Sequence, residues 1–337
     1  MEDSKYCRVC VTGGSGYIGS YLIKKLLDNG TYIVHATLRN LGDSAKVGLL
    51  KRLRGAETRL KLFEADIYNP EMFEPALQDC KFVFLVATPM MHTHNSKFKD
   101  TTEAAVAGVK SIAMSCIKSG TVRRLIYTAS CVSASTSNND GTSFAEFMDE
   151  SCWTSPDMPL SFAHEFEKAY ALSKTASERE VLKFGESGNL EVVSLVCGVV
   201  GGETLLPYVP VSLAVCVSQL KNEESIAFGQ LRFTEEICGK IPVIHIEDTC
   251  DAHIFCIEKD SINGRFLCAS DFVSSADIAA YYTQKFPELS VKQGYVGEPR
   301  KVEWGSTKLV EEGFEYKYDL KMILDDSVEC ARRLESI

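Results

Sequence analysis

A glycine-rich segment directly after the first apolar run constrains the fold of this chain more than any other feature. The segment VTGGSGYIG spaces Gly13, Gly16 and Gly19 three residues apart. A strand pattern at residues 5–13 leads into it, and an amphipathic helix pattern at 17–30 follows. Gly13 would permit a tight turn, Gly16 a close approach of the backbone to a pyrophosphate, and Gly19 close packing of helix on strand. The unpaired N–H groups of the helix start favour phosphate, so the segment predicts a dinucleotide site.

The first half of the chain alternates strand and helix patterns. Strand patterns occupy residues 5–13, 32–39, 59–66, 81–88, 123–130 and 190–200, and helix patterns 17–30, 44–53, 69–79 and 101–120. Such alternation predicts a Rossmann-like α/β fold with a doubly wound parallel sheet.

The pattern becomes irregular from about Val199. It resumes with a strand and a helix over residues 241–259 and closes with an amphipathic helix over 319–336. We therefore expect a dinucleotide-binding domain over residues 1–198, with 241–258 contributing. Residues 199–337 would mainly form a smaller, partly discontinuous C-terminal lobe for the substrate.

Composition narrows the functional class. The formal net charge of −10 argues against a nucleic-acid partner, because phosphate binding needs a concentrated basic face. The longest apolar stretch, residues 205–217, is short and holds two prolines, so no membrane span is expected. No secretory signal precedes the first strand pattern, and thirteen cysteines then indicate reduced core thiols in a cytoplasmic protein. We find no ligand set for a metal, and we expect a monomer or a weak dimer.

The end of the second strand pattern bears on the choice of cofactor. An acidic residue there would favour NAD, but this chain has Arg39, whose guanidinium suits the 2′-phosphate of NADP. Lys46 on the next helix pattern adds positive charge or faces solvent. Asp66, which ends the third strand pattern, either accepts a hydrogen bond from the adenine amino group or caps the following helix. NADPH is therefore the expected cofactor.

The spacing Tyr-x-x-x-Lys would place a phenol and an ammonium on one helix face, and it occurs as Tyr21/Lys25, Tyr170/Lys174 and Tyr281/Lys285, so the spacing alone selects none of them. The first pair lies on the helix that the pyrophosphate site needs, and the third lies outside the dinucleotide half. The second pair follows a strand pattern that ends at Ser130, beside the expected cofactor. We therefore select Tyr170 and Lys174.

Residues four apart share a helix face, so the Lys174 ammonium would lower the pKa of the Tyr170 phenol. Ser130 would hold the substrate carbonyl against Tyr170 for proton transfer. Thr128 and Ser133 are the alternatives to Ser130, unless they serve only strand-end packing and helix capping.

Taken together, these residues resemble the extended short-chain dehydrogenase/reductase family, and within it the plant dihydroflavonol reductase-like group. The matching segments are VTGGSGYIGS, VFLVATPM, RRLIYTAS, YALSKTASE, IHIEDTCDAHIF and EEGFEYKYDLKMILDDSV. The resemblance implies an NADPH-dependent carbonyl reductase with Ser130, Tyr170 and Lys174 as its catalytic residues. The implied cofactor contacts are Gly13, Gly16, Tyr17, Ile18, Gly19, Arg39, Lys46, Asp66, Ile67, Val86, Ala87, Thr88, Tyr170, Lys174, Cys197 and Val199. The implied substrate contacts are Met90, Met91, His92, Ser130 and Ser133.

The chain departs from the group at several places, and two of them bear on the cofactor and the substrate. The strand after the triad usually carries a proline beside the nicotinamide, and this chain has Cys197 or Gly198 there, which predicts a looser wall behind the cofactor. The loop that holds His92 and His94 is also unusual; these histidines either line the substrate cleft or form an exposed pair.

The expected function is NADPH-dependent reduction of a ketone or unsaturated ring in a plant specialised metabolite. Flavonoid-like and isoflavonoid-like substrates come first, and an alkaloid is the next choice. Two alternatives are an NAD(P)-dependent epimerase or dehydratase of the same fold and a non-catalytic cofactor-binding protein. Arg39 argues against the epimerase, and an intact triad argues against the non-catalytic protein.

Overall fold

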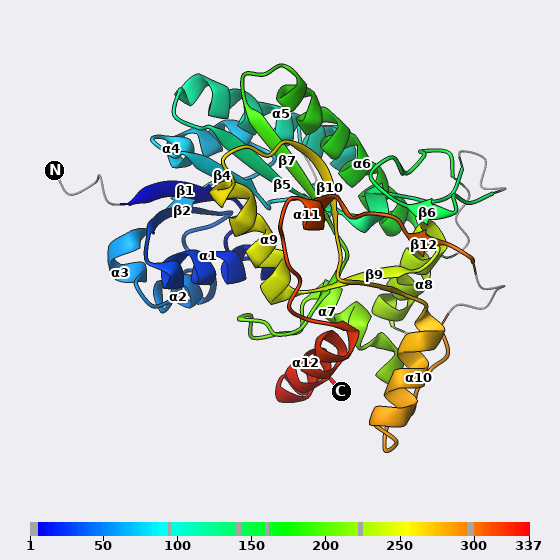
Figure 1. Cartoon of the computed structure of the whole chain (residues 1–337). Helices are drawn as coiled ribbons and strands as arrows, with labels where there is room; N and C mark the ends of the chain where they lie inside the picture. Colours follow the sequence, from blue (N-terminus) through cyan, green and yellow to red (C-terminus); the bar gives the residue numbers. More distant parts are fainter. Residues whose placement is uncertain are drawn as a thin grey trace. The chain divides into compact units, whose positions relative to one another are not determined.

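The computed structural model describes residues 6–93, 96–138, 143–158, 162, 164–221, 225–294 and 300–337, so His94 lies outside the described residues. A seven-stranded parallel sheet has the order β10-β7-β5-β4-β1-β2-β3 (Figure 1). Its strands are β1 (Cys7–Val11), β2 (Tyr32–Leu38), β3 (Leu60–Glu64), β4 (Phe82–Leu85), β5 (Arg124–Ser130), β7 (Glu191–Cys197) and β10 (Gly264–Cys268). The predicted Rossmann-like fold is confirmed.

Helices cover both faces of this sheet. Figure 1 shows α1 and α9 on one face and α4 and α5 on the other. The helices of this part are α1 (Tyr17–Asn29), α2 (Ser44–Lys51), α3 (Ala56–Arg59), the 3-10 turn η2 (Pro70–Phe73), α4 (Glu74–Leu77), α5 (Thr101–Ser119), α6 (Glu165–Glu186) and α9 (Ile246–Glu258). Helix α1 buries its apolar face and ends at Gly30, which adopts a φ of 87°.

The remaining elements form two small sheets with helices around them. Strands β8 (Val199–Gly201), β9 (Ile241–His245) and β11 (Asp271–Val273) form one sheet, and β6 (Phe147–Met148) pairs with β12 (Glu303–Trp304). The helical elements here are η3 (Cys131–Ser133), α7 (Val211–Cys216), η4 (Ser218–Leu220), α8 (Ile226–Cys238), α10 (Ser275–Lys285), α11 (Lys308–Glu311) and α12 (Leu320–Arg333).

The chain divides into two compact units. The first unit comprises Met1–Thr128, Ala176–Leu195 and Cys250–Arg265, and the second comprises Ala129–Thr175, Val196–Thr249 and Phe266–Ile337. Each unit is thus built from three separate stretches of chain. The functional boundary between residues 198 and 199 stays a prediction.

Two of the expected elements were wrong. The strand pattern over residues 190–200 is two strands in different sheets, because β7 ends at Cys197 and β8 begins at Val199. Gly198 allows this change of sheet, since a Cβ there would lie 2.6 Å from the carbonyl oxygen of Pro242. The segment expected to be irregular contains α8, which Ser225 caps by accepting the N–H of Phe228.

The cysteines are core residues, as predicted. All thirteen are free thiols, and all but Cys7 are buried. Burial raises the pKa of the Cys80 thiol to about 12 and that of Cys10 well above its ordinary value. These thiols therefore stay protonated and behave as small apolar side chains.

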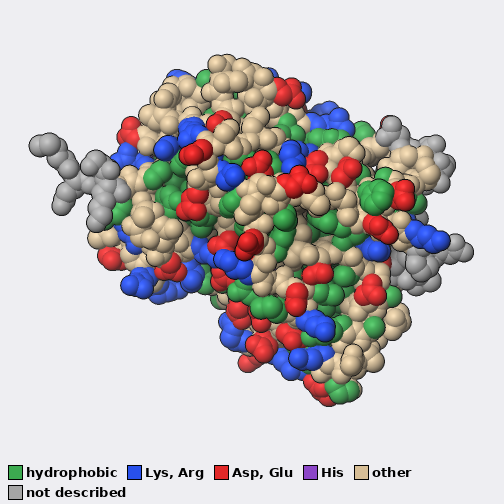
Figure 2. All heavy atoms as spheres, in the orientation of Figure 1, with side chains coloured by type: hydrophobic (Ala, Val, Ile, Leu, Met, Phe, Trp, Pro, Cys, Tyr) green, Lys and Arg blue, Asp and Glu red, His purple; other side chains and the backbone are tan. Residues whose placement is uncertain are grey.

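The surface carries mixed charge. On the face shown in Figure 2, lysine and arginine side chains lie among aspartate and glutamate side chains, as on an ordinary solvated surface. In the ranges that the structure describes, no helix has the length and apolar character that crossing a membrane requires.

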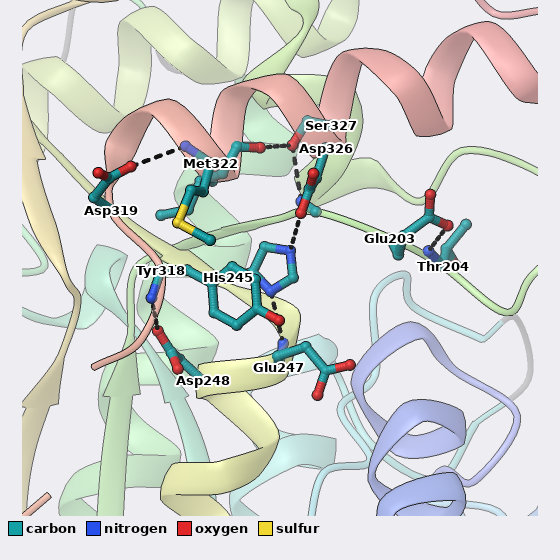
Figure 3. Close-up of polar contacts among 12 residues, drawn as sticks. Glu203, Thr204, His245, Glu247, Asp248, Tyr318, Asp319, Met322, Asp326 and Ser327 are labelled. Atoms are coloured by element: carbon teal, nitrogen blue, oxygen red, sulfur yellow. Dashed lines mark hydrogen bonds and ion pairs between the residues drawn. The ribbon is translucent and has the colours of Figure 1, made fainter. Parts of the chain in front are cut away.

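A polar cluster around the buried His245 stabilises the second unit (Figure 3). Its Nδ1 accepts the backbone N–H of Glu247 at 3.1 Å, so the ring proton lies on Nε2, which faces Asp326 Oδ2 at 3.3 Å. The ring stacks on Tyr318 with a centroid distance of 3.8 Å. Asp248 accepts the N–H of Tyr318 at 3.0 Å, so β9, α9 and the segment before α12 are joined at one point.

The loop after β8 passes directly over this imidazole. Gly202 donates its N–H to Ser327 Oγ at 2.8 Å and adopts a φ of 96°. A Cβ at Gly202 would collide with the His245 ring. The loop can therefore keep this path only with glycine at position 202.

Replacing Gly202 by alanine should lower the free energy of unfolding by about 2–4 kcal/mol, because positive φ and overpacking both oppose the new Cβ. Gly313→Ala is the matched control, since Gly313 has a φ of 99° and open space around it. That variant should lose only about 1 kcal/mol. Urea unfolding of both variants gives the comparison, and equal losses would contradict the proposed collision with His245.

Candidate active site

The glycine turn between β1 and α1 is packed against backbone. Gly13 adopts a φ of 67°, and a Cβ there would lie 3.0 Å from Ala87 Cα. A Cβ on Gly19 would collide with the carbonyl oxygen of Gly13. Gly19 therefore allows α1 to pack closely against the backbone that leaves β1, and its role in packing helix on strand stays a prediction. Gly16 is exposed and precedes α1, so the first N–H groups of α1 lie beside an open turn.

Two further residues shape this turn, and the sequence motif did not reveal them. Gly14 has no room for a Cβ, which would lie 2.8 Å from Ile23 Cδ1. Thr12 Oγ1 accepts the N–H groups of Val86 and Ala87, both at 3.0 Å. The turn after β1 and the end of β4 are thereby held together. A threonine at the end of a first strand is the only sequence signal for this link.

The implied cofactor contacts of the first unit differ in exposure. Ile67 is buried, Arg39 and Lys46 are exposed, and Tyr17, Ile18, Asp66, Val86, Ala87 and Thr88 are partly exposed. These side chains and the glycine turn all belong to the first unit.

Arg39 follows the last residue of β2 and is exposed. Among the described residues, no carboxylate lies within ion-pair distance of its guanidinium. Lys46 differs, because its Nζ pairs with Asp43 Oδ2 at 3.1 Å and that carboxylate also caps α2. The Arg39 guanidinium is therefore the cation best placed to bind an anion at this strand end.

Asp66 closes a turn after β3. Its Oδ1 accepts the N–H of Tyr68 at 3.0 Å, and its carbonyl accepts the N–H of Asn69 at 2.8 Å. The alternative that Asp66 caps the following helix was wrong, since Asn69 is the residue that precedes η2. The buried side chain of Ile67 lies where a Cβ on Gly108 would have to go.

The second unit brings Ser130 and Tyr170 together. Ser130 ends β5, and Tyr170 and the buried Lys174 lie one turn apart on α6. Ser130 lies beside the Tyr170 phenol and lowers its pKa by hydrogen bonding. Phe166 stacks on the Tyr170 ring with an interplanar angle of 8°.

Burial is the largest influence on the Tyr170 phenol and raises its pKa to about 12, while the hydrogen bond to Ser130 lowers it. The pKa is thus raised in this structure, and not lowered as the spacing of Tyr170 and Lys174 led us to expect. Desolvation disfavours the phenolate more strongly than the nearby polar groups favour it. Tyr170 is consequently a neutral phenol at neutral pH, which is the form of a proton donor.

The neighbouring candidates have other partners. Ser133 is fully buried and donates its hydroxyl to the Ser130 carbonyl at 2.8 Å, so it shapes the turn that follows Ser130. Thr128 Oγ1 lies 2.8 Å from His253 Nε2 in the first unit. Cys197 and Val199 are buried in the second unit, and Cys197 adds to the raised pKa of Tyr170.

The other two tyrosine–lysine pairs are explained by ion pairs. Lys25 Nζ lies 2.6 Å from Asp251. Tyr281 donates to Asp325 Oδ1 at 2.7 Å, and Lys285 Nζ lies 3.0 Å from Oδ2 of the same carboxylate. Both lysines thus neutralise a carboxylate of their own unit.

A buried ion pair anchors α6 beyond Lys174. Glu178 Oε1 accepts hydrogen bonds from Ser194 Oγ at 2.7 Å and from Arg265 Nε at 2.8 Å. Glu178 is fully buried and Arg265 nearly so. Breaking such a pair leaves an uncompensated charge, so the helix that carries Tyr170 is tied firmly to β7 and β10.

The loop after β4 exposes apolar side chains. Met90 and Met91 are 45% and 73% exposed, and His92 is exposed beside them. Among the described residues, no group of three or more His, Cys, Asp or Glu side chains is arranged to hold a metal ion.

The chain is similar to known proteins over most of its length. A family model described as "NAD dependent epimerase/dehydratase family" matches residues 9–269. A putative anthocyanidin reductase of Ginkgo biloba is 34% identical over 95% of this chain and 93% of its own length. Noscapine synthase SDR1 of Papaver somniferum is 33% identical over 96% and 92%. The crystal structure of vestitone reductase from Medicago sativa covers 98% of this chain and 99% of its own, with 30% identity and a TM-score of 0.79.

The Tyr170 phenol should stay neutral through pH 10, because its pKa is raised to about 12. NMR of protein labelled with ¹³C at tyrosine Cζ, with Tyr170→Phe to assign the signal, measures this directly. A midpoint below pH 9 for the move of the signal to the phenolate position would contradict this prediction. It would mean that the Lys174 ammonium lowers the pKa of Tyr170 by more than burial raises it.

Proposed function

This chain belongs to the NAD dependent epimerase/dehydratase family, and we propose that it is an NADPH-dependent reductase of a ketone or unsaturated ring. The broader class is an NAD(P)-dependent oxidoreductase related to the flavonoid reductases. The observation that carries the proposal is the position of Ser130 beside the Tyr170 phenol, with Lys174 on the next turn of the same helix. That arrangement suits proton donation to a carbonyl oxygen.

The first unit fits a dinucleotide phosphate. Gly16, which precedes α1, has no Cβ. The turn therefore leaves open space beside the backbone N–H groups at the start of α1. In the proposal, Arg39 pairs with the 2′-phosphate and Asp66 accepts from the adenine amino group. Asp66 Oδ1 already accepts the N–H of Tyr68, which leaves Asp66 less capacity to accept a hydrogen bond from the adenine amino group. NADPH, when bound, supplies the hydride.

Three side chains of the second unit would handle the substrate oxygen. Ser130 hydrogen-bonds the carbonyl oxygen and holds it against Tyr170. The Tyr170 hydroxyl then gives its proton to that oxygen, which becomes the hydroxyl of the product. Lys174 lies on the same face of α6 and would hold the nicotinamide ribose while its charge stabilises the phenolate left behind.

The proposed substrate is a flat polycyclic metabolite. Relatives at 33–34% identity are named for an anthocyanidin and for the alkaloid noscapine, which supports a flavonoid-like or alkaloid ring system. Exposed Met90 and Met91 provide apolar contact of the kind such rings need. Thirteen free thiols support a reducing compartment, for which we propose the cytosol. Action as a monomer or weak dimer stays a prediction.

Replacing Tyr170 by phenylalanine should lower kcat/KM about 100- to 10,000-fold, because the proton donor is lost. The measurement is NADPH consumption against a panel of anthocyanidins, dihydroflavonols, isoflavanones and alkaloid ketones. Tyr281→Phe is the matched control, since it removes a phenol from the same Tyr-x-x-x-Lys spacing and should leave kcat/KM unchanged. Full activity in Tyr170→Phe would refute the proposed proton donor. Tightly bound NAD that copurifies and is not consumed would instead indicate an epimerase.

Replacing Arg39 by alanine should raise the Kd for NADPH about 10- to 100-fold, because a charge-assisted bidentate contact is lost. The Kd for NADH should change little, since NADH lacks the 2′-phosphate. Fluorescence titration with both nucleotides gives the comparison, with Arg52→Ala as the control for the loss of an exposed arginine nearby. An equal loss of affinity for the two nucleotides would refute the role of Arg39.

A further inference from the structure

Residues 88–93, a described part of the β4–α5 loop, are organised around one buried tyrosine of the first unit. Tyr68 follows β3 and is 8% exposed. Its position is set locally by the Asp66–Asn69 turn, in which Asp66 Oδ1 accepts the Tyr68 N–H. Pro70 then starts η2 and ends the turn. The Tyr68 side chain is therefore presented by rigid backbone.

The Tyr68 hydroxyl holds the loop at two points. It donates to the carbonyl oxygen of Met91 at 2.8 Å and accepts the N–H of Thr93 at 3.2 Å. These bonds flank His92, so the backbone on both sides of that residue is fixed by a single oxygen atom. Sequence analysis did not single out Tyr68, because its partners lie 23 and 25 residues away.

Aromatic contacts complete the enclosure of the ring. His92 meets Tyr68 edge-on, with centroids 6.2 Å apart, and Phe98 lies tilted at 6.3 Å. Lys97 Nζ lies 3.8 Å from Glu71 Oε2, which links the end of the loop to η2. The loop thus wraps around Tyr68 rather than extending freely from β4.

This arrangement leaves a fixed backbone with adaptable apolar side chains. Met91 is 73% exposed although its carbonyl is held by Tyr68. Methionine side chains are flexible and polarizable. Two of them on a fixed backbone can therefore adjust their rotamers to a flat ring of the substrate while their Cα atoms stay in position. Without the Tyr68 hydroxyl, the loop would lose conformational entropy each time a ligand binds. That entropic cost would weaken the affinity for the ligand.

We propose that Tyr68 is a positioning residue that sets substrate affinity by holding the β4–α5 loop, whose exposed Met90 and Met91 would provide apolar contact to the substrate. The inference rests on the proposed reductase function for its kinetic consequence. Its structural part, the fixing of the loop, does not depend on that function.

The kinetic test uses Tyr68→Phe in the full chain, with the panel member that wild type reduces fastest. KM should rise about 3- to 10-fold while kcat changes less than about twofold, because two hydrogen bonds to the loop are lost and the proton donor is untouched. Tyr32→Phe is the matched control, since Tyr32 is 6% exposed in the same unit and donates to Glu258 at 3.1 Å. That variant should keep the wild-type KM.

A double-mutant cycle with Met91→Ala tests whether Tyr68 acts through the loop. The two changes together should raise KM by less than the product of the single effects, since both remove the same contact. Multiplicative effects, or an unchanged KM in Tyr68→Phe, would overturn the assignment of Tyr68 as a positioning residue for substrate.

Hydrogen exchange of the peptide that contains residues 88–98 tests the loop without any substrate. The Thr93 amide should exchange faster in Tyr68→Phe than in wild type and Tyr32→Phe. Unchanged exchange would overturn the proposal at its structural base. Faster exchange in a protein that reduces no ketone would confirm the held loop and refute its role in substrate affinity together with the reductase function.

Discussion

The turn between β1 and α1 packs against other backbone so closely that Gly13 and Gly19 have no room for a Cβ, and the arrangement of the first unit depends on this packing. Gly13 lies against the backbone of Ala87, while Thr12 binds the N–H groups of Val86 and Ala87. One tight turn thereby places the start of α1 beside the end of β4. Because unpaired N–H groups at a helix start attract phosphate, the same contact would also shape the proposed phosphate site.

The proposed reaction also requires a proton donor that stays protonated, the role that we propose for Tyr170. Burial favours this state, since desolvation raises the pKa of Tyr170 to about 12 and outweighs the opposite effect of Ser130. The donor must also stay in place, and α6 is held by the buried pair of Glu178 and Arg265. A buried ion pair contributes little net stability, so its value here lies in fixing where the helix sits.

Sequence patterns predicted those features that depend on local chemistry. The glycine spacing located the turn at Gly13, and alternating patterns identified the parallel sheet. Features that depend on contacts between distant residues were missed, such as the space that Gly198 leaves for Pro242. Tyr68 was missed for the same reason, because its partners Met91 and Thr93 are brought to it only by folding. The pKa of Tyr170 was misjudged because burial cannot be read from a four-residue spacing.

The central claim is that hydride passes from the cofactor to a ketone carbon while Tyr170 protonates the oxygen. Reduction with NADPH deuterated at the transferable position of C4, followed by mass spectrometry of the product, tests it most directly. The account predicts one deuterium on the former carbonyl carbon in wild type and almost no product in Tyr170→Phe. A product without deuterium, formed while NADPH is oxidised, would contradict direct transfer and with it the proposed reaction.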